Sequence, residues 1–157
     1  MTPYLPGLFE RLMGERAGEP AGRQSLEQLK DSIVRDLEAL LNTRSGLAQD
    51  SLDAWPQARA SVLDYGLADF AAFSLSGSED RAAICAGIKE AIERHEPRLA
   101  GVSAVLEPEP GAVNRLRFVI HATLRSGDGA EPVDFDAVLQ PSSLHYKVDR
   151  TGRPARS

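Results

Sequence analysis

The residue types best suited to chemistry are three histidines and one cysteine, and their positions argue against a reactive centre. His95, His121 and His145 fall on different predicted elements and lack the spacing of metal ligands. Cys85 lies on or beside the apolar stripe of a predicted helix, where we interpret it as a packed, inert thiol. No nucleophile motif of the G-x-S-x-G type is present. The sequence therefore predicts no metal site and no cofactor.

Carboxylates are the remaining candidates for catalysis. The chain holds 23 acidic residues, and a glycosidase needs only two carboxyl groups at the right separation. With so many acidic residues, some lie close together by coincidence. The sequence therefore singles out no catalytic residue, and we predict that the protein is not an enzyme.

Glu96, Pro97 and Arg98 place opposite charges on either side of a proline, where a helix gives way to a strand. The proline fixes the direction in which the chain leaves the helix. The two charged side chains could be a solvated surface pair, which is worth under about 1 kcal/mol. They could also be half of an acid–base site, or a docking motif whose charge-assisted hydrogen bonds become strong when a partner excludes water.

Composition narrows the class of protein. A chain of 157 residues is expected to form one domain. Its net charge of −5 argues against general binding to nucleic acid. A single cysteine fits a reducing compartment, and no apolar run reaches the roughly 18–20 residues that span a bilayer. The first residues lack the features of a secretory signal. We therefore predict a cytoplasmic protein without direct membrane insertion.

Three regions are predicted along the chain. Residues 1–24 form an apolar segment followed by a flexible, glycine-containing linker. Residues 25–148 form a single domain, and residues 149–157 form a disordered basic tail. A short apolar segment on such a linker either folds back onto the core or is delivered to another protein.

Two amphipathic helices are predicted within the domain. The first covers residues 25–44, with Ser25 and Gln28 as a capping box and leucines at three- and four-residue steps. The second begins with Ser78 as its N-cap and ends near His95, because a residue before proline disfavours the helical conformation. Its predicted buried stripe is Ala82, Ile84, Cys85, Ile88, Ala91 and Ile92.

Beyond Pro97 the apolar residues alternate with a period of two, which is typical of strands. Strands are predicted over residues 99–107, 115–125 and 133–139, with a glycine-rich loop at 126–132 and a short edge strand at 145–148. Short connections favour an antiparallel meander covered by the helices. The fold class is therefore α+β, with two main helices on a small, mainly antiparallel sheet. We expect part of the C-terminal sheet edge to stay open for a partner strand.

Three segments carry a resemblance to a known family. DSIVRDLEALLNTR (31–44), SVLDYGL (61–67) and IERHEPRLAGVSAVL (92–106) resemble TssE, the small wedge protein of type VI secretion baseplates. TssE is related to the phage tail-baseplate wedge family once labelled a lysozyme. PGLFERL near the N-terminus is similar to the segment that opens many members. The resemblance covers most of residues 5–140.

The resemblance implies a structural role at the inner face of the inner membrane. It implies that Glu96, Pro97 and Arg98 dock onto larger wedge subunits similar to TssF and TssG, and that the sheet seeds assembly of sheath subunits. Two alternatives stay open: a peptidoglycan-cleaving, lysozyme-like glycosidase and an adaptor of the same fold that binds a regulatory protein. The predicted cytoplasmic location weighs against the glycosidase, because peptidoglycan lies outside the inner membrane.

Overall fold

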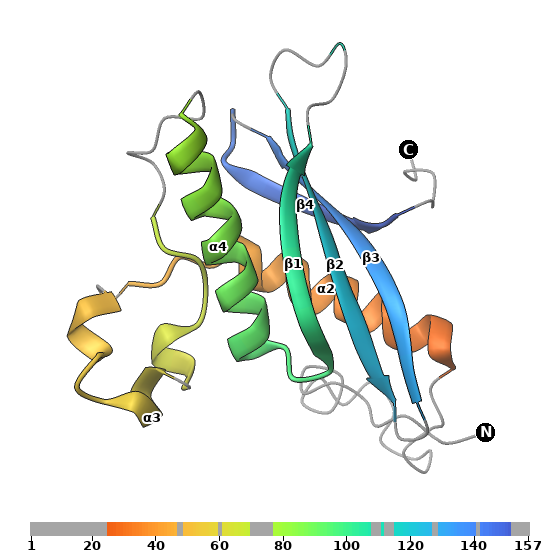
Figure 1. Ribbon diagram of the computed structural model, residues 1–157, viewed down its shortest axis with the longest axis horizontal. Coiled ribbons are helices and arrows are strands. Elements are labelled where there is room, and N and C mark those ends of the chain that lie inside the picture. Colours follow the sequence, from red (N-terminus) through yellow and green to blue (C-terminus); the bar gives the residue numbers. More distant parts are fainter. Residues whose placement is uncertain are drawn as a thin grey trace.

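The computed structural model describes residues 25–46, 49–59, 61–69, 77–107, 111, 115–126, 129–140 and 142–151. Two long helices, α2 (Leu26–Asn42) and α4 (Ser78–His95), pack against a four-stranded sheet (Figure 1). Three short helical segments connect them: η1 (Gln49–Leu52), α3 (Pro56–Arg59) and η2 (Val62–Asp64). The predicted α+β class is confirmed. The N-terminal apolar segment and its linker lie outside the described residues.

The sheet is a simple meander. Its strands are β1 (Leu99–Glu107), β2 (Leu116–Ser126), β3 (Gly129–Gln140) and β4 (His145–Arg150), in that spatial order and each antiparallel to the next. The loop predicted over residues 126–132 is wrong, because Ser126 already pairs with Gly129. Strand β4 also extends two residues beyond the predicted domain, to Arg150, which forms an ion pair with Glu27 of α2. Residues 152–157 lie outside the described part of the chain.

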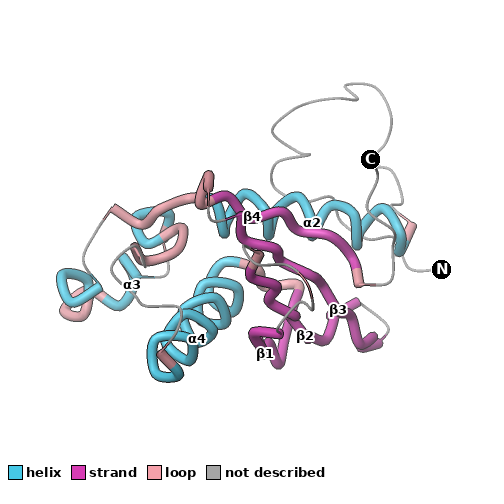
Figure 2. The backbone as a smooth tube through the Cα atoms, turned by 90° about the horizontal axis from the view of Figure 1, so that it is seen from above, coloured by secondary structure: helices cyan, strands magenta, loops and turns pink. Residues whose placement is uncertain are grey.

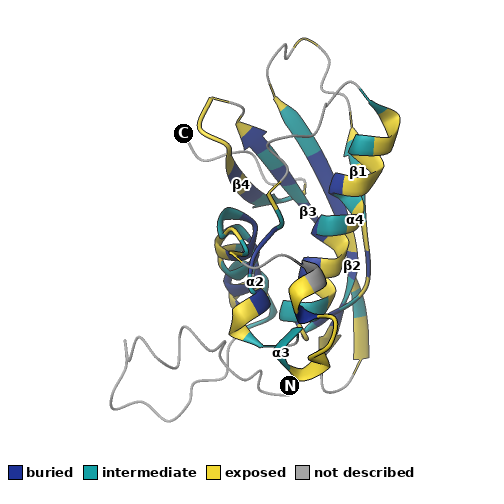
Figure 3. Cartoon of the chain, turned by 90° about the vertical axis from the view of Figure 1, so that its left-hand side faces the viewer, coloured by how far each residue is buried: buried dark blue, intermediate teal, exposed yellow. Residues whose placement is uncertain are grey.

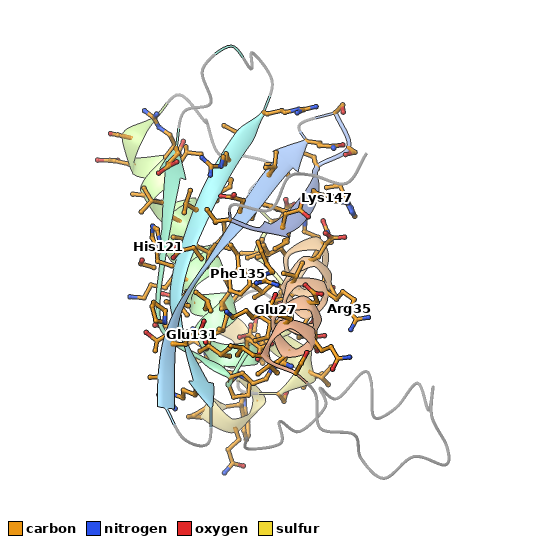
Figure 4. All side chains as sticks on the ribbon, turned by 90° about the vertical axis from the view of Figure 1, so that its right-hand side faces the viewer. Glu27, Arg35, His121, Glu131, Phe135 and Lys147 are labelled. Carbon is orange, nitrogen blue, oxygen red and sulfur yellow. The ribbon has the colours of Figure 1, made fainter. Side chains whose placement is uncertain are left out.

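The core lies between the sheet and the two helices. Figure 2 shows α2 running along β4 while α4 lies beside β1. Buried residues line the inner sides of both helices and the sheet (Figure 3). The largest fully buried side chains include Phe118, Phe135, Ile33, Leu37, Ile88 and Ile92. Phe135 lies between the sheet and α2, whereas His121 points away from the opposite face (Figure 4).

The two helices begin differently from one another. Ser25 accepts a hydrogen bond from the Gln28 amide and Gln28 returns one to Ser25, so the predicted capping box is confirmed. The predicted N-cap of the second helix is wrong, since Gly77 takes that position and Ser78 is the first helical residue. Ala82 is exposed rather than buried. No helix among the described residues is long and apolar enough to cross a membrane.

Strand β1 carries an irregularity near its start. The register with β2 shifts between Ala100 and Ser103, and Gly101 has φ +58°, a left-handed conformation that favours glycine. The extra residue lets Leu99 and Val102 both turn into the core, with 4% and 2% of their surfaces exposed. Regular alternation would have placed one of them on the opposite face.

The edge formed by β4 is closed by α2. Asn42 donates to the Tyr146 carbonyl at 2.8 Å and accepts from the Tyr146 amide at 2.8 Å. The Val148 amide donates to Glu38 at 2.9 Å. These side chains occupy backbone groups that an added strand would need. The expectation of an open C-terminal edge is therefore wrong at Tyr146 and Val148.

A glycine fixes the connecting segment against the end of α2. Leu67 forms a parallel bridge with Arg44, and the Leu67 amide donates to the Thr43 carbonyl at 2.8 Å. Gly66 has φ +118°, and a Cβ atom there would lie 2.5 Å from the Thr43 carbonyl oxygen. Both the conformation and the close approach require glycine.

We expect Gly66→Ala to lower the free energy of unfolding by about 1–3 kcal/mol. The added Cβ atom would strain the backbone and collide with the Thr43 carbonyl group. Gly46→Ala is the matched control, since nothing lies within 4 Å of a Cβ atom there. Urea unfolding of both variants measures the difference. Equal stability of the two variants would contradict this account of Gly66.

Candidate functional site

The end of α4 places Glu96 inside the protein. Glu96 is the C-cap of the helix, and its amide donates to the Ile92 carbonyl at 2.8 Å. The Leu99 amide then donates to the Glu96 carbonyl at 3.1 Å, so the turn through Pro97 leads directly into β1. Only 4% of Glu96 is exposed. A carboxylate at this depth must be paired, because burying an isolated charge is costly.

Arg98 pairs with Glu96 through a bidentate hydrogen bond. Its Nε and Nη2 atoms each lie 2.7 Å from one of the two Glu96 carboxylate oxygens. The Arg98 backbone amide also donates to the Glu96 carboxylate, at 3.3 Å. Such bidentate, charge-assisted bonds are among the strongest in proteins. The two charges flanking Pro97 therefore neutralise each other within the chain, and the interpretation as a solvated surface pair is wrong.

The same guanidinium group reaches across to α2. Arg98 donates to the Asp36 carboxylate, and its Nη1 atom lies 3.3 Å from the Ser32 hydroxyl oxygen. Burial lowers the pKa of Arg98, but the hydrogen bonds and charges of Glu96 and Asp36 outweigh it and raise the pKa overall. Arg98 thus stays protonated and connects the α4–β1 turn to α2.

A second buried ion pair lies next to the first. Asp64, at the end of η2 and 3% exposed, accepts a hydrogen bond from Arg94. The Tyr65 ring meets the His95 ring edge to face at 5.3 Å. Burial raises the pKa of Tyr65, and the charges of Asp36 and Glu96 raise it further. Tyr65, which follows Asp64 in the chain, therefore lies near charged groups of both ion pairs.

His95 belongs to this second group. One of its ring nitrogens, Nε2, lies 3.1 Å from the Asp64 carbonyl oxygen. Burial lowers the pKa of His95, and the contact with Asp64 offsets only part of that shift. The neutral form of His95 is therefore favoured. A neutral ring suits packing against Tyr65 better than the role of a general acid.

Together these residues form what we call the α4-end cluster: Ser32, Asp36, Asp64, Tyr65, Arg94, His95, Glu96 and Arg98. Three carboxylates and two guanidinium groups meet in it, from three separate segments of the chain. Sequence reasoning singled out Glu96 and Arg98 but missed Asp36 and Asp64. Asp64 lies within SVLDYGL (61–67), one of the segments that carry the family resemblance. That resemblance was the feature of the sequence that could have indicated Asp64 as a functional residue.

The arrangement suits structural bracing better than catalysis. Each carboxylate of the cluster accepts a hydrogen bond from an arginine, and two of the three are almost fully buried. Within the described residues, no three His, Cys, Asp or Glu side chains form a group that could hold a metal ion. His95, His121 and His145 remain apart, on α4, β2 and β4. Pro97 is exposed on the surface above the cluster.

The fold is a small α+β domain in which the end of α4, held by the α4-end cluster, leads directly into the sheet. The sequence profile of one family, described as baseplate wedge protein gp25, matches residues 27–128. This span contains the whole α4-end cluster. The chain therefore belongs to the gp25 baseplate wedge protein family, and the predicted family relationship is confirmed.

Two solved structures are similar to this chain. One belongs to the baseplate complex from the type VI secretion system: it is 21% identical, with a TM-score of 0.47, and the match covers 73% of this chain and 96% of that chain. The other is a crystal structure of a candidate tail lysozyme from Geobacter sulfurreducens: it is 20% identical, with a TM-score of 0.46, and the match covers 84% and 99%. No curated protein matches the sequence.

We expect Glu96→Ala to lower the free energy of unfolding by about 3–5 kcal/mol, because it leaves the buried part of Arg98 without its main partner. Glu107→Ala is the matched control: Glu107 also pairs with an arginine, Arg117, but its side chain is 48% exposed. That change should cost less than about 1 kcal/mol. Chemical denaturation measures both, and a Glu96 variant as stable as the control would show that the pair is dispensable.

Proposed function

We propose that this chain is a non-catalytic structural subunit of a type VI secretion baseplate. In this role it docks onto the larger wedge subunits and anchors or initiates the contractile sheath. Membership of the gp25 baseplate wedge family is the observation that carries the proposal. The resemblance of residues 31–44, 61–67 and 92–106 to TssE narrows it to the secretion system. The proposal implies assembly in the cytoplasm, at the inner face of the inner membrane.

The α4-end cluster supports a docking role for the Glu-Pro-Arg turn. Pro97 is exposed, and the neighbouring Arg98 side chain is 21% exposed. Glu96, Asp36 and Ser32 fix the Arg98 guanidinium in one orientation. A partner that covers this turn meets a rigid surface, so little conformational entropy is lost on binding. In this proposal Pro97 and the outer part of Arg98 make the contact, while Glu96 holds them in place.

The structural role also fits the lack of a free acid–base pair in the cluster. A glycosidase needs one carboxylic acid with a raised pKa beside a second carboxylate. The cluster instead pairs Asp64 with Arg94 and Glu96 with Arg98. Both of these carboxylates are thus already engaged by an arginine within the chain.

A substitution at Pro97 can distinguish an effect on docking from an effect on folding. We expect Pro97→Asp to weaken binding to the purified complex of larger wedge subunits by at least about tenfold, because it places a new charge in a contact that excludes water. Stability should change by no more than about 1 kcal/mol, since the side chain is exposed. Pro132→Asp, at an exposed proline on β3, is the matched control.

Affinity measurement and a thermal melt on each variant decide the matter. If the wild-type chain binds the wedge complex and Pro97→Asp binds equally well, the turn is not the docking surface. If the wild-type chain does not bind the wedge complex at all, the assembly role itself is wrong.

The lysozyme-like alternative makes the opposite prediction for enzymatic activity. We expect no hydrolysis of purified peptidoglycan by the full chain, because each buried carboxylate of the cluster is paired with an arginine. The assay follows release of soluble muropeptides over time. Product that disappears when one carboxylate is replaced would overturn the non-catalytic proposal.

A further inference from the structure

Three large apolar side chains are exposed in the segment that connects the two long helices. Trp55 is 68% exposed, Val62 82% and Leu63 57%. Among the described residues, the other exposed large apolar residues are Val105, on β1, and Leu144, just before β4. Most of the exposed apolar surface of this kind therefore falls within residues 55–63, whereas single exposed apolar residues are normally scattered. We call Trp55, Val62 and Leu63 the connector patch.

Hydrogen bonds hold the backbone that carries the connector patch. The Ala58 amide donates to the Trp55 carbonyl at 2.9 Å, and the Ser61 hydroxyl donates to the Ala58 carbonyl at 2.6 Å. The Leu63 amide donates to the Ser61 hydroxyl oxygen at 3.2 Å. Helix α3 packs against η2 but has no buried residue of its own. These turns thus hold apolar side chains outward and contribute little to the core.

The connector patch adjoins the Glu-Pro-Arg turn. Leu63 is followed by Asp64, which forms an ion pair with the last turn of α4, and by Tyr65, whose ring meets the His95 ring at 5.3 Å. That turn of α4 directly precedes Pro97. In Figure 1, α3 lies beside the same end of α4, on the side away from the sheet. A partner that covers Pro97 can therefore reach the connector patch as well.

The surroundings of the connector patch indicate what kind of surface it fits. Asp53 and Arg59, the charged side chains next to Trp55, form an ion pair at 2.7 Å. The patch itself is an indole ring with two aliphatic side chains, and tryptophan is enriched among the residues that dominate the energy of protein interfaces. A membrane surface is disfavoured, because anionic headgroups attract clusters of lysine and arginine. The best fit is an apolar pocket on a protein.

We propose that the connector patch anchors the chain in an apolar pocket of the larger wedge subunits, beside the contact at Pro97. Trp55 fills the pocket, while Val62 and Leu63 exclude water around it. This inference rests on the proposed docking function and deepens it. The Glu-Pro-Arg turn orients the contact, and the connector patch supplies most of its affinity.

The free chain provides the first test, because Trp55 is its only tryptophan and its fluorescence reports on the connector patch alone. We expect the emission of a water-exposed indole and ready quenching by acrylamide. A shielded Trp55 would show that the chain covers the patch itself, for example with residues 1–24, and would overturn the proposal. A blue shift on adding vesicles of phosphatidylcholine and phosphatidylglycerol would overturn it in favour of a membrane surface.

Affinity for the purified complex of larger wedge subunits provides the second test. Trp55→Ala should weaken binding at least about thirtyfold, as expected for a tryptophan at the centre of an interface. Leu63→Ala should weaken it about three- to tenfold. Leu144→Ala is the matched control, since Leu144 is 52% exposed but lies outside the patch, and its affinity should be unchanged. Melting temperatures should stay within about 2 °C of the wild type, because all three side chains are exposed.

The results separate this inference from the proposed function. If the wild-type chain binds the wedge complex and Trp55→Ala binds equally well, the connector patch is not the anchor, although the docking function stands. The same holds if Leu144→Ala weakens binding as much as Leu63→Ala. If the wild-type chain does not bind the wedge complex, the proposed function fails and this inference fails with it.

Discussion

The pairing of Glu96 with Arg98 is the interaction on which the arrangement of the helices and the sheet depends. A carboxylate that is 4% exposed carries a large desolvation cost unless a cation meets it with good geometry. Arg98 does so with two bonds of 2.7 Å, and its remaining donors reach Asp36 and Ser32. One guanidinium group therefore connects the turn between α4 and β1 to α2.

The neighbouring ion pair of Asp64 and Arg94 attaches the segment that connects the two long helices to the end of α4. Residues 61–69 are joined to the rest of the fold by this ion pair, by the Tyr65–His95 ring contact and by the bridge at Leu67, whose side chain is buried in the core. Gly66 permits the close approach to Thr43 that accompanies the bridge at Leu67. The segment is attached through polar and backbone bonds whose geometry is specific. It is thereby held beside the Glu-Pro-Arg turn, which gives that turn a fixed surrounding surface.

Helix α2 has two further tasks besides covering the core. Through Asp36 it braces the end of α4, and through Glu38 and Asn42 it closes the edge of β4. Closing an edge protects a sheet from unplanned pairing with other chains.

Much of this could be predicted from the sequence, because it depends on local patterns. The capping box at Ser25, the end of α4 before Pro97 and the alternation along β2 each follow from neighbouring residues alone. The bulge at Gly101 could not be predicted, since alternation on either side of a glycine fits more than one register. Nor could the partners of Arg98: Asp36 lies 62 residues away and looks like any other polar residue on a helix. The sequence by itself determined the elements and the family; only the tertiary structure decided which charges are buried and which edge is closed, because both depend on contacts between segments distant in the chain.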